Sequence, residues 1–418
     1  MPAKQYPSTG SSLYPPLFWI HKANDQRPKL SLEQLPAELQ THIFVLAQNP
    51  ELATVCTSFW ELSFSPLVRA QYLLLRFGKD AALGERAMSY RIANLKVIDN
   101  LLKLGCNPRA DGDWLYWRAC TKHNVHLCRL ILAAAQPTPK ILGHFLNVAA
   151  MKGAIEIIDL LVEEYGADVH QPNNEDLVLM LACAENQVSV VRHLMRRYGC
   201  NVHANRERHL RRACLQGHLE LVELLLDGAY VHAYNDAALQ NAAHKGHSAI
   251  VKRLLEAGAN PQANQNAPLQ YTIAVDDELS VRYLLDAGAD PHCDQEWPIR
   301  HACRRGATKI VECLLDHGVD PDVAKGMPLR EALRSSSYQT AQFLLNRKVD
   351  PNSTGAIRGI CNAVRRNDLE LVMLMARYGT RLDHPEILIS ALSPCQPTKG
   401  NIRNFVKEWC QEQEENIL

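Results

Sequence analysis

The feature that most constrains this chain is a short motif that recurs at a fixed spacing. A glycine followed by Ala or Val and then by Asn-Pro or Asp-Pro stands at Gly258, Gly288 and Gly318, so the motif returns every 30 residues. Leucine pairs keep the same spacing, a few residues before each glycine or its equivalent: Leu254-Leu255, Leu284-Leu285, Leu314-Leu315 and Leu344-Leu345. Self-similarity of this kind indicates a repeat array, in which each unit stacks on its neighbours.

Each repeat is expected to contain two helices. The leucine pairs lie on segments whose apolar spacing is helical, and these segments form the second helix. The first helix is expected to begin near Pro268, Pro298 and Pro328, because proline is tolerated in the first turn of a helix. Gly246 and Gly306 stand between the two helices and permit a sharp turn. The unit is therefore helix, tight turn, helix, glycine stop and short loop.

This unit resembles the ankyrin repeat. The segment Asn-Ala-Ala-His-Lys-Gly-His-Ser-Ala-Ile-Val-Lys-Arg-Leu-Leu-Glu-Ala-Gly-Ala-Asn, residues 241–260, follows the family pattern almost throughout, and weaker copies lie on both sides. The resemblance implies an all-α ankyrin-repeat solenoid of about ten helix pairs over residues 84–383, with a groove for a protein along its inner helices. Because the family's usual period is longer, the hairpin loops are expected to be short. Residues 384–418 are expected to form a C-terminal helical cap and an acidic tail.

The N-terminal part of the chain has a different composition. Residues 1–29 are rich in proline with scattered Ser and Asn, which is typical of a disordered lead. Residues 30–80 predict three helices. The first helix opens at Leu35-Pro36. The second spans residues 52–62 and contains Phe59-Trp60, and the third opens at Ser65-Pro66.

The three helices resemble an F-box, through the Leu-Pro start, the pattern Val-Cys-x-x-Phe-Trp and the Ser-Pro that follows. The resemblance implies that this module binds a Skp-type adaptor of a cullin ubiquitin ligase. The residues expected to contact the adaptor are Leu35, Pro36, Leu39, Ile43, Val55, Phe59 and Trp60. The alternative is that the three helices only cap the array, since every solenoid needs a polar-faced end.

Positive charge recurs at one position of the repeat. In the ankyrin fold the two residues before the turn glycine lie on the inner face of the first helix, and in the C-terminal repeats these are mostly arginines. We therefore expect the target-binding groove to use Lys245, Trp297, Arg300, Arg304, Arg305, Met327, Arg330, Arg334, Arg365 and Arg366. Arginines can make bidentate contacts to carboxylate or phosphate, so an acidic or phosphorylated target segment is predicted. The alternative is an ordinary solvated face, where an exposed ion pair contributes at most ~1 kcal/mol.

The composition removes several classes of partner. The chain has 45 basic and 45 acidic side chains, so no overall field attracts it to nucleic acid or to an anionic membrane. There is no apolar run of about 18 residues and no secretory signal, so neither a spanning helix nor export is expected. The expected partners are proteins, with no nucleic acid and no membrane, and the expected location is the cytoplasm or nucleus.

No motif of catalysis or of metal binding is visible. The chain has 13 cysteines but no Cys-x-x-Cys pair, and Cys120, Cys183, Cys214 and Cys303 share one repeat position that is Ala elsewhere. These cysteines are expected to be small core residues. No phosphate loop, serine elbow or His-Glu-x-x-His helix is present. We expect a non-catalytic receptor without a cofactor or a metal, recruiting targets to a ubiquitin ligase; the alternative is an ankyrin scaffold or inhibitor with no ligase link.

Overall fold

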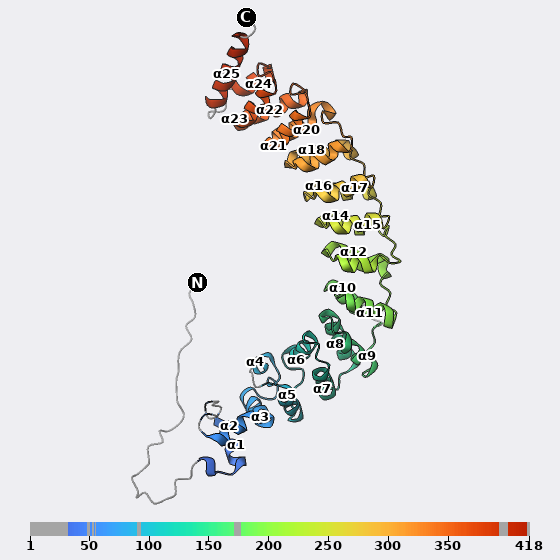
Figure 1. Ribbon diagram of the computed structural model, residues 1–418, viewed down its shortest axis with the longest axis vertical. Helices are drawn as coiled ribbons and strands as arrows, with labels where there is room; N and C mark the ends of the chain where they lie inside the picture. The colour runs from blue at the N-terminus through green and yellow to red at the C-terminus, as the bar shows by residue number, and fades with distance from the viewer. Residues whose placement is uncertain are drawn as a thin grey trace, which may run out of the picture. The chain divides into compact units, whose positions relative to one another are not determined.

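The computed structural model describes residues 32–47, 51, 54, 56–89, 93–170, 177–392 and 400–415. All regular structure in these residues is helical, with no strand (Figure 1). The chain forms two compact units, Met1–Leu115 and Tyr116–Leu418, whose boundary falls inside α6 (Ala110–Thr121). Within the described ranges no helix has both the length and the apolar character needed to cross a bilayer.

The first unit places helices at the three positions predicted near the N-terminus. Its elements are the 3-10 helix η1 (Leu32–Gln34), α1 (Ala37–Ala47), α2 (Thr57–Phe64), α3 (Pro66–Phe77), α4 (Glu85–Met88) and α5 (Leu95–Lys103). Helices α1, α2 and α3 contact one another, and α3 also contacts α5. The small core between them contains Phe44, Val45, Phe59 and Val68, and the rings of Phe44 and Phe59 stack with centroids 6.0 Å apart.

The second unit is a stack of consecutive helix pairs. Its helices are α7 (Val125–Ala135), α8 (Pro139–Lys152), α9 (Ile155–Glu163), α10 (Leu177–Ala184), α11 (Val188–Tyr198), α12 (Ala204–Gln216), α13 (Leu219–Leu225), α14 (Ala237–Lys245), α15 (Ser248–Glu256), α16 (Ala263–Ala274), α17 (Glu278–Asp286), α18 (Cys293–Arg305), α19 (Thr308–Asp316), α20 (Val323–Arg334), α21 (Tyr338–Asn346), α22 (Thr354–Arg366), α23 (Leu369–Arg377), α24 (Pro385–Leu392) and α25 (Gly400–Glu415). The even-numbered helices from α8 to α24 contact one another in succession and form the first-helix layer (Figure 1). The odd-numbered helices form a second layer in the same way. The predicted solenoid of helix pairs is confirmed.

The core of this unit lies between the two layers. Leu284 and Leu314, the first members of their pairs, are fully buried. The cysteines at the shared repeat position are buried too, as the sequence predicted. Burial raises the pKa of Cys183 to about 12, so this thiol stays protonated at neutral pH. No group of His, Cys, Asp or Glu within the described ranges is arranged to hold a metal ion.

The two glycine positions of the repeat both use left-handed backbone. Gly246 and Gly306 turn the chain between the helices of a pair, with φ of 72° and 75°. Gly258 and Gly288 close the second helix, with φ of 90° and 94°. Only glycine adopts such angles without steric cost, which explains why the glycines mark the period so clearly.

The loop that leads into the next first helix differs from the expected hairpin. Asn264, Gln265 and Asn266 all have left-handed backbone, with φ of 50°, 59° and 60°. The same run of three occurs at residues 205–207, 234–236, 294–296 and 324–326. Right-handed helix resumes after the run, so Pro268 falls in its first turn as predicted. Most of these residues carry a side chain, and holding non-glycine residues there costs free energy that other contacts must offset.

The third residue of the run bonds to the next repeat. The Glu207 carboxylate accepts the Tyr230 N–H (3.0 Å), and the Asp236 carboxylate accepts the Asn260 N–H (2.9 Å). One repeat later, the Asn266 side-chain oxygen accepts a backbone N–H at 3.0 Å. Glu207, Asp236 and Asn266 are all buried. We call these three bonds the loop staples, because each joins one loop to the loop of the following repeat.

Replacing Leu284 by Ala is expected to lower the free energy of unfolding by about 2–5 kcal/mol, because it opens a cavity between the two layers. The measurement is chemical denaturation. Leu279 lies on the same helix, α17, but is 51% exposed. Its replacement by Ala is the control and should change stability by no more than about 0.5 kcal/mol. Equal effects of the two substitutions would show that the helix faces are assigned wrongly.

Asp236→Ala is expected to cost about 1–3 kcal/mol, because it leaves the Asn260 N–H without its acceptor. Asp236→Asn should cost less, since Asn266 makes the same bond with an amide oxygen one repeat later. Denaturation of both variants, with hydrogen exchange at Asn260, measures the difference. If Asn260 exchanges no faster in the alanine variant, the staple does not stabilise the loop.

Candidate protein-binding surfaces

The Leu-Pro start of the first helix is held in place by a buried glutamine. The side-chain amide of Gln40 donates hydrogen bonds to the carbonyl oxygens of Leu32 (3.1 Å) and Leu35 (2.9 Å). Gln40 itself is buried in α1. Because these bonds tie the approach segment to the helix, Pro36 and Leu39 keep a fixed position at its surface. The sequence analysis missed Gln40, since a polar residue inside a helix carries no signal of burial.

Three of the predicted adaptor-binding residues are exposed. Leu39 is 51% and Trp60 is 54% exposed, and Pro36 is exposed beside them in sequence. The Trp60 ring packs edge-on against Phe64, with centroids 5.1 Å apart, and Phe64 is exposed as well. Large apolar side chains open to solvent are typical of a surface that another protein covers.

The other predicted residues that the structure describes are less exposed. Phe59 is fully buried in the core of the first unit, so its assignment as a contact residue is wrong. Ile43 is half-buried and packs against the same core, and Leu35 is half-buried. Val55 lies outside the described residues. Because neighbouring residues of a helix point in directions about 100° apart, Phe59 faces inward while Trp60 faces solvent.

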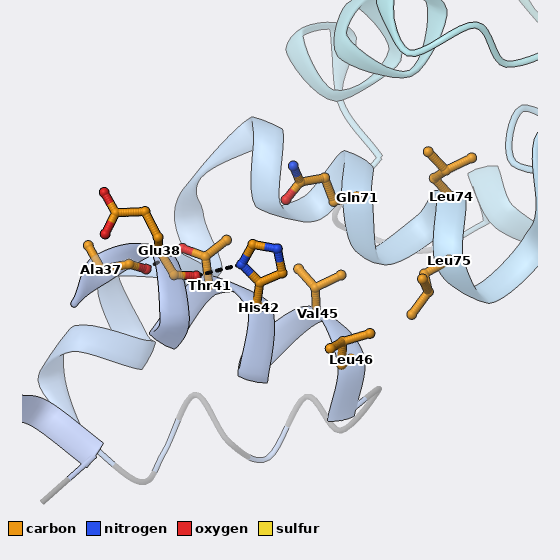
Figure 2. A pocket seen from close by; sticks show the side chains of 9 residues that line it. All are labelled: Ala37, Glu38, Thr41, His42, Val45, Leu46, Gln71, Leu74 and Leu75. Carbon is orange, nitrogen blue, oxygen red and sulfur yellow. Dashed lines mark hydrogen bonds between the residues drawn. The ribbon is translucent and has the colours of Figure 1, made fainter. Parts of the chain in front are cut away.

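A groove between α1 and α3 adds apolar surface that the sequence analysis did not identify. Figure 2 shows its nine lining residues: Ala37, Glu38, Thr41, His42, Val45, Leu46, Gln71, Leu74 and Leu75. Its volume is about 530 Å³. The His42 Nδ1–H donates to the Glu38 carbonyl oxygen at 2.8 Å, which holds the ring at the groove wall. In the sequence, the apolar pairs Val45-Leu46 and Leu74-Leu75 were the signal from which this groove could have been predicted.

On the second unit, the predicted target residues all lie on the first-helix layer. Lys245, Arg304, Arg305, Arg334, Arg365 and Arg366 are exposed, and Trp297, Arg300, Met327 and Arg330 are half-buried. We call Arg304, Arg305, Arg334, Arg365 and Arg366 the basic stripe. They occupy the C-terminal ends of three first helices, α18, α20 and α22.

Two residues of the stripe are free, and two more make a single local interaction. Arg305 and Arg365 form no hydrogen bond or ion pair with any described residue. Arg334 lies 3.6 Å from the buried Glu331 carboxylate, and Arg304 donates to His301 Nδ1 at 2.9 Å. Burial, with the charges of Arg304 and Arg305, lowers the pKa of His301, so His301 is neutral and accepts this bond.

An aromatic residue joins the stripe at α18. The Trp297 indole stacks on His301, with centroids 4.4 Å apart and planes at 11°. Trp297, Arg300, His301, Arg304 and Glu331 line one small pocket of about 40 Å³. The sequence analysis named the tryptophan and the two arginines but missed His301 and Glu331. Glu331 places one negative charge within the predicted basic face.

Other predicted arginines already contact groups of the array itself. Arg366 donates to the carbonyl oxygens of Arg334 and Leu333, at the C-terminal end of α20. Arg300 donates to the Gln295 carbonyl oxygen in the left-handed loop, at 3.2 Å. Arg330 contacts the Met327 sulfur at 3.8 Å. These contacts stabilise the array and leave fewer N–H groups for a target.

Comparison with known proteins identifies the repeat. A family model described as ankyrin repeats matches in three copies, over residues 146–235, 210–295 and 269–355. Together the matches span residues 146–355, which are 210 of the 418 residues. This chain belongs to the ankyrin-repeat family.

Solved ankyrin-repeat structures are similar to part of this chain. The ankyrin repeat domain of human ASB11 is 24% identical, with 48% of this chain and 96% of that chain covered and a TM-score of 0.41. A domain from Acinetobacter baumannii AYE is 26% identical, with 42% and 98% covered and a TM-score of 0.37. The domain of Bcl-3, a member of the IkappaB protein family, is 23% identical, with 50% and 98% covered and a TM-score of 0.39. A comparison with curated proteins gives no match.

Membership of the ankyrin family gives the array a general role. The ankyrin fold is typically a non-catalytic scaffold for protein interaction, so the array binds a protein target. This ankyrin protein departs from its family at the loop, where left-handed residues and loop staples replace the projecting hairpin. The residues predicted to bind the target lie on the first-helix layer, and their role stays a prediction.

Proposed function

We propose that this ankyrin protein is the substrate-recognition subunit of a cullin-type ubiquitin ligase. Helices α1 to α3 bind a Skp-type adaptor, and the first-helix layer holds the protein to be ubiquitinated. The chain itself performs no catalysis and acts in the cytoplasm or nucleus. The observation that carries the proposal is the exposure of large apolar side chains, led by Leu39 and Trp60, on helices with an F-box-like sequence.

The apolar surface of the first unit supports a stable protein contact. Six large hydrophobic residues of α1 to α3 are exposed: Leu39, Leu46, Trp60, Phe64, Leu67 and Leu75. Burying one such side chain against a partner contributes roughly 1.5–3 kcal/mol, and a buried Trp is a frequent centre of binding energy. The bonds from Gln40 hold the Leu35 segment in advance, so little conformational freedom is lost on binding.

A second reading is a plain ankyrin scaffold or inhibitor whose N-terminal helices serve only as a cap. It is favoured by one observation, the contact between α3 and α5 within the first unit. A cap, however, needs a polar outer face to keep the array soluble. The exposed Trp60 and Phe64 pair is the opposite of such a face. The ligase reading therefore accounts for more of the surface.

The target segment is proposed to be acidic or phosphorylated and extended along the basic stripe. Arg304, Arg334 and Arg365 occupy equivalent positions on three successive first helices, with Arg305 beside Arg304, so a segment crossing the repeats meets them in turn. Bidentate contacts from guanidinium groups suit carboxylate and phosphate oxygens. Trp297, stacked on His301, offers an apolar anchor beside them.

Leu39→Asp with Trp60→Asp is expected to abolish adaptor capture, because it places charges in the apolar contact. Both residues are exposed, so the fold should persist and the melting temperature should stay nearly unchanged. A pull-down with a Skp-type adaptor and its cullin measures the effect. Leu279→Asp, an exposed leucine on α17, is the matched control. Capture that is equal in all three proteins, or absent from the wild type, would favour the plain scaffold.

Arg304→Glu with Arg305→Glu is expected to reduce target capture by at least about tenfold, since two charges in a cooperating set are reversed. Adaptor capture should be unaffected, and wild-type target capture should fall as salt is raised. Affinity purification with quantitative identification of the bound proteins measures this effect. Undiminished target capture by the double variant would mean that the basic stripe is an ordinary solvated face.

A further inference from the structure

A second group of arginines lies on α12, away from the basic stripe along the sequence. Arg206, Arg208, Arg211 and Arg212 all fall within this helix, between its left-handed start and its middle. None of the four forms an ion pair with a described residue. The sequence analysis considered the residues before each turn glycine and the helix starts of the C-terminal repeats, so it passed over this group although four arginines in seven residues are visible.

The two carboxylates of the adjoining loops do not neutralise these arginines. Glu207 is buried, and its carboxylate accepts hydrogen bonds from the Tyr230 N–H and from His203, the latter at 3.0 Å. Asp236 is buried in the same way and accepts from His232 at 3.0 Å and from the backbone of Asn260. The acidic groups of these loops serve the fold, so they leave the arginines available to an external anion. Arg211 donates its Nε–H and one Nη–H to the carbonyl oxygens of Arg206 and Asn205, at 3.2 Å and 3.5 Å, and offers its remaining N–H groups.

A tyrosine ring holds two of the guanidinium groups in one place. The guanidinium carbons of Arg206 and Arg211 lie 5.2 Å and 4.6 Å from the centroid of the Tyr234 ring. The Arg211 Nε–H also donates to the Arg206 carbonyl oxygen at 3.2 Å. Cation–π contacts and this bond order the two side chains before any ligand arrives. Arg206 lies in the left-handed run, so its backbone is fixed as well.

This arrangement fits a compact anion better than it fits a nucleic acid. A phosphate monoester carries about two negative charges and three acceptor oxygens, which guanidinium groups held beside one ring can bind. Single-stranded nucleic acid binds mainly by stacking bases on free aromatic rings along a basic groove. Here the Tyr234 ring already contacts the guanidinium groups of Arg206 and Arg211, so it is not free to stack on a base. The net charge of +0 also gives no long-range attraction for a polyanion.

We propose that α12 and the 230–236 loop bind a phosphoserine or phosphothreonine in a segment of a partner protein. Arg206 and Arg211 bind the phosphate group. Tyr230, which is 65% exposed, packs against the segment on one side, and Arg208 and Arg212 lie along its course. The proposal rests on the proposed function only in that the ankyrin array holds a protein, and it is independent of the adaptor.

The test uses degenerate peptide libraries, because no target sequence is required. One library has a central phosphoserine or phosphothreonine flanked by random residues, and the other is the same library unphosphorylated. The full chain, immobilised, is expected to retain the phosphorylated library at least about tenfold better. In a protein whose free stripe arginines are already replaced (Arg305→Gln with Arg365→Gln), adding Arg206→Gln with Arg211→Gln should remove this preference. Glutamine holds the equivalent of position 211 in the next two repeats, at Gln240 and Gln270, and donates to the same loop carbonyl, so the loop should stay intact.

Two controls separate this site from the others. Arg305→Gln with Arg365→Gln removes two free arginines of the basic stripe and should keep the preference. Leu39→Asp with Trp60→Asp should also keep it, so a failed adaptor pull-down leaves this proposal standing. Equal retention of the two libraries by the wild type overturns it, as does a preference that survives Arg206→Gln with Arg211→Gln in the protein whose free stripe arginines are replaced. Tighter binding of fluorescein-labelled oligouridine RNA, lost in the same double variant, would overturn it in favour of a nucleic-acid surface.

Discussion

Three consecutive residues in left-handed backbone are the constraint on which this array depends. Each non-glycine residue there costs roughly 1–2 kcal/mol, so the run persists only because other contacts hold it. The loop staples from Glu207, Asp236 and Asn266 are such contacts, and each of them joins its own repeat to the next one. The compact loop also shortens the period to 30 residues, because the loop needs fewer residues than a hairpin would. Spacing, loop shape and the coupling between repeats therefore have one origin.

The same loop decides which arginines remain available for binding. Arg300 and Arg211 both donate to a carbonyl of the left-handed run before their helix, so part of each guanidinium is used by the fold. Arg366 is used in a similar way at the end of α20. Arg305, at the far end of its helix from the loop, has no such acceptor. Arg305 and Arg366 hold the same repeat position, the last residue of a first helix, so contacts with the preceding helix, rather than repeat position alone, separate a structural arginine from a free one.

Much of the fold could be predicted from the sequence, and less of the surface. Glycines and leucines at a constant spacing allowed the helix pairs to be predicted, because left-handed turns and buried positions recur with the period of the repeat. The left-handed loop was not predictable, because Asn264 and Asn266 favour positive φ but Gln265 and residues of other runs, such as Ala324, do not. Phe59 was misassigned because an adjacent aromatic pair on a helix has one member inside and one outside. Whether Arg366 binds a carbonyl or a target depends on contacts between repeats, which spacing does not encode.

The two units offer surfaces that differ in physical character. On α1 to α3 the exposed residues are Leu39, Trp60 and their apolar neighbours, so binding there gains free energy mainly from area removed from water. Such contacts strengthen slightly or stay constant as salt rises. On the array the free groups are guanidinium ions, whose attraction for an exposed anion is screened over about 10 Å at moderate salt. Under the proposed function, the adaptor is expected to stay bound at salt concentrations that release the target, because one contact is screened by ions and the other is not.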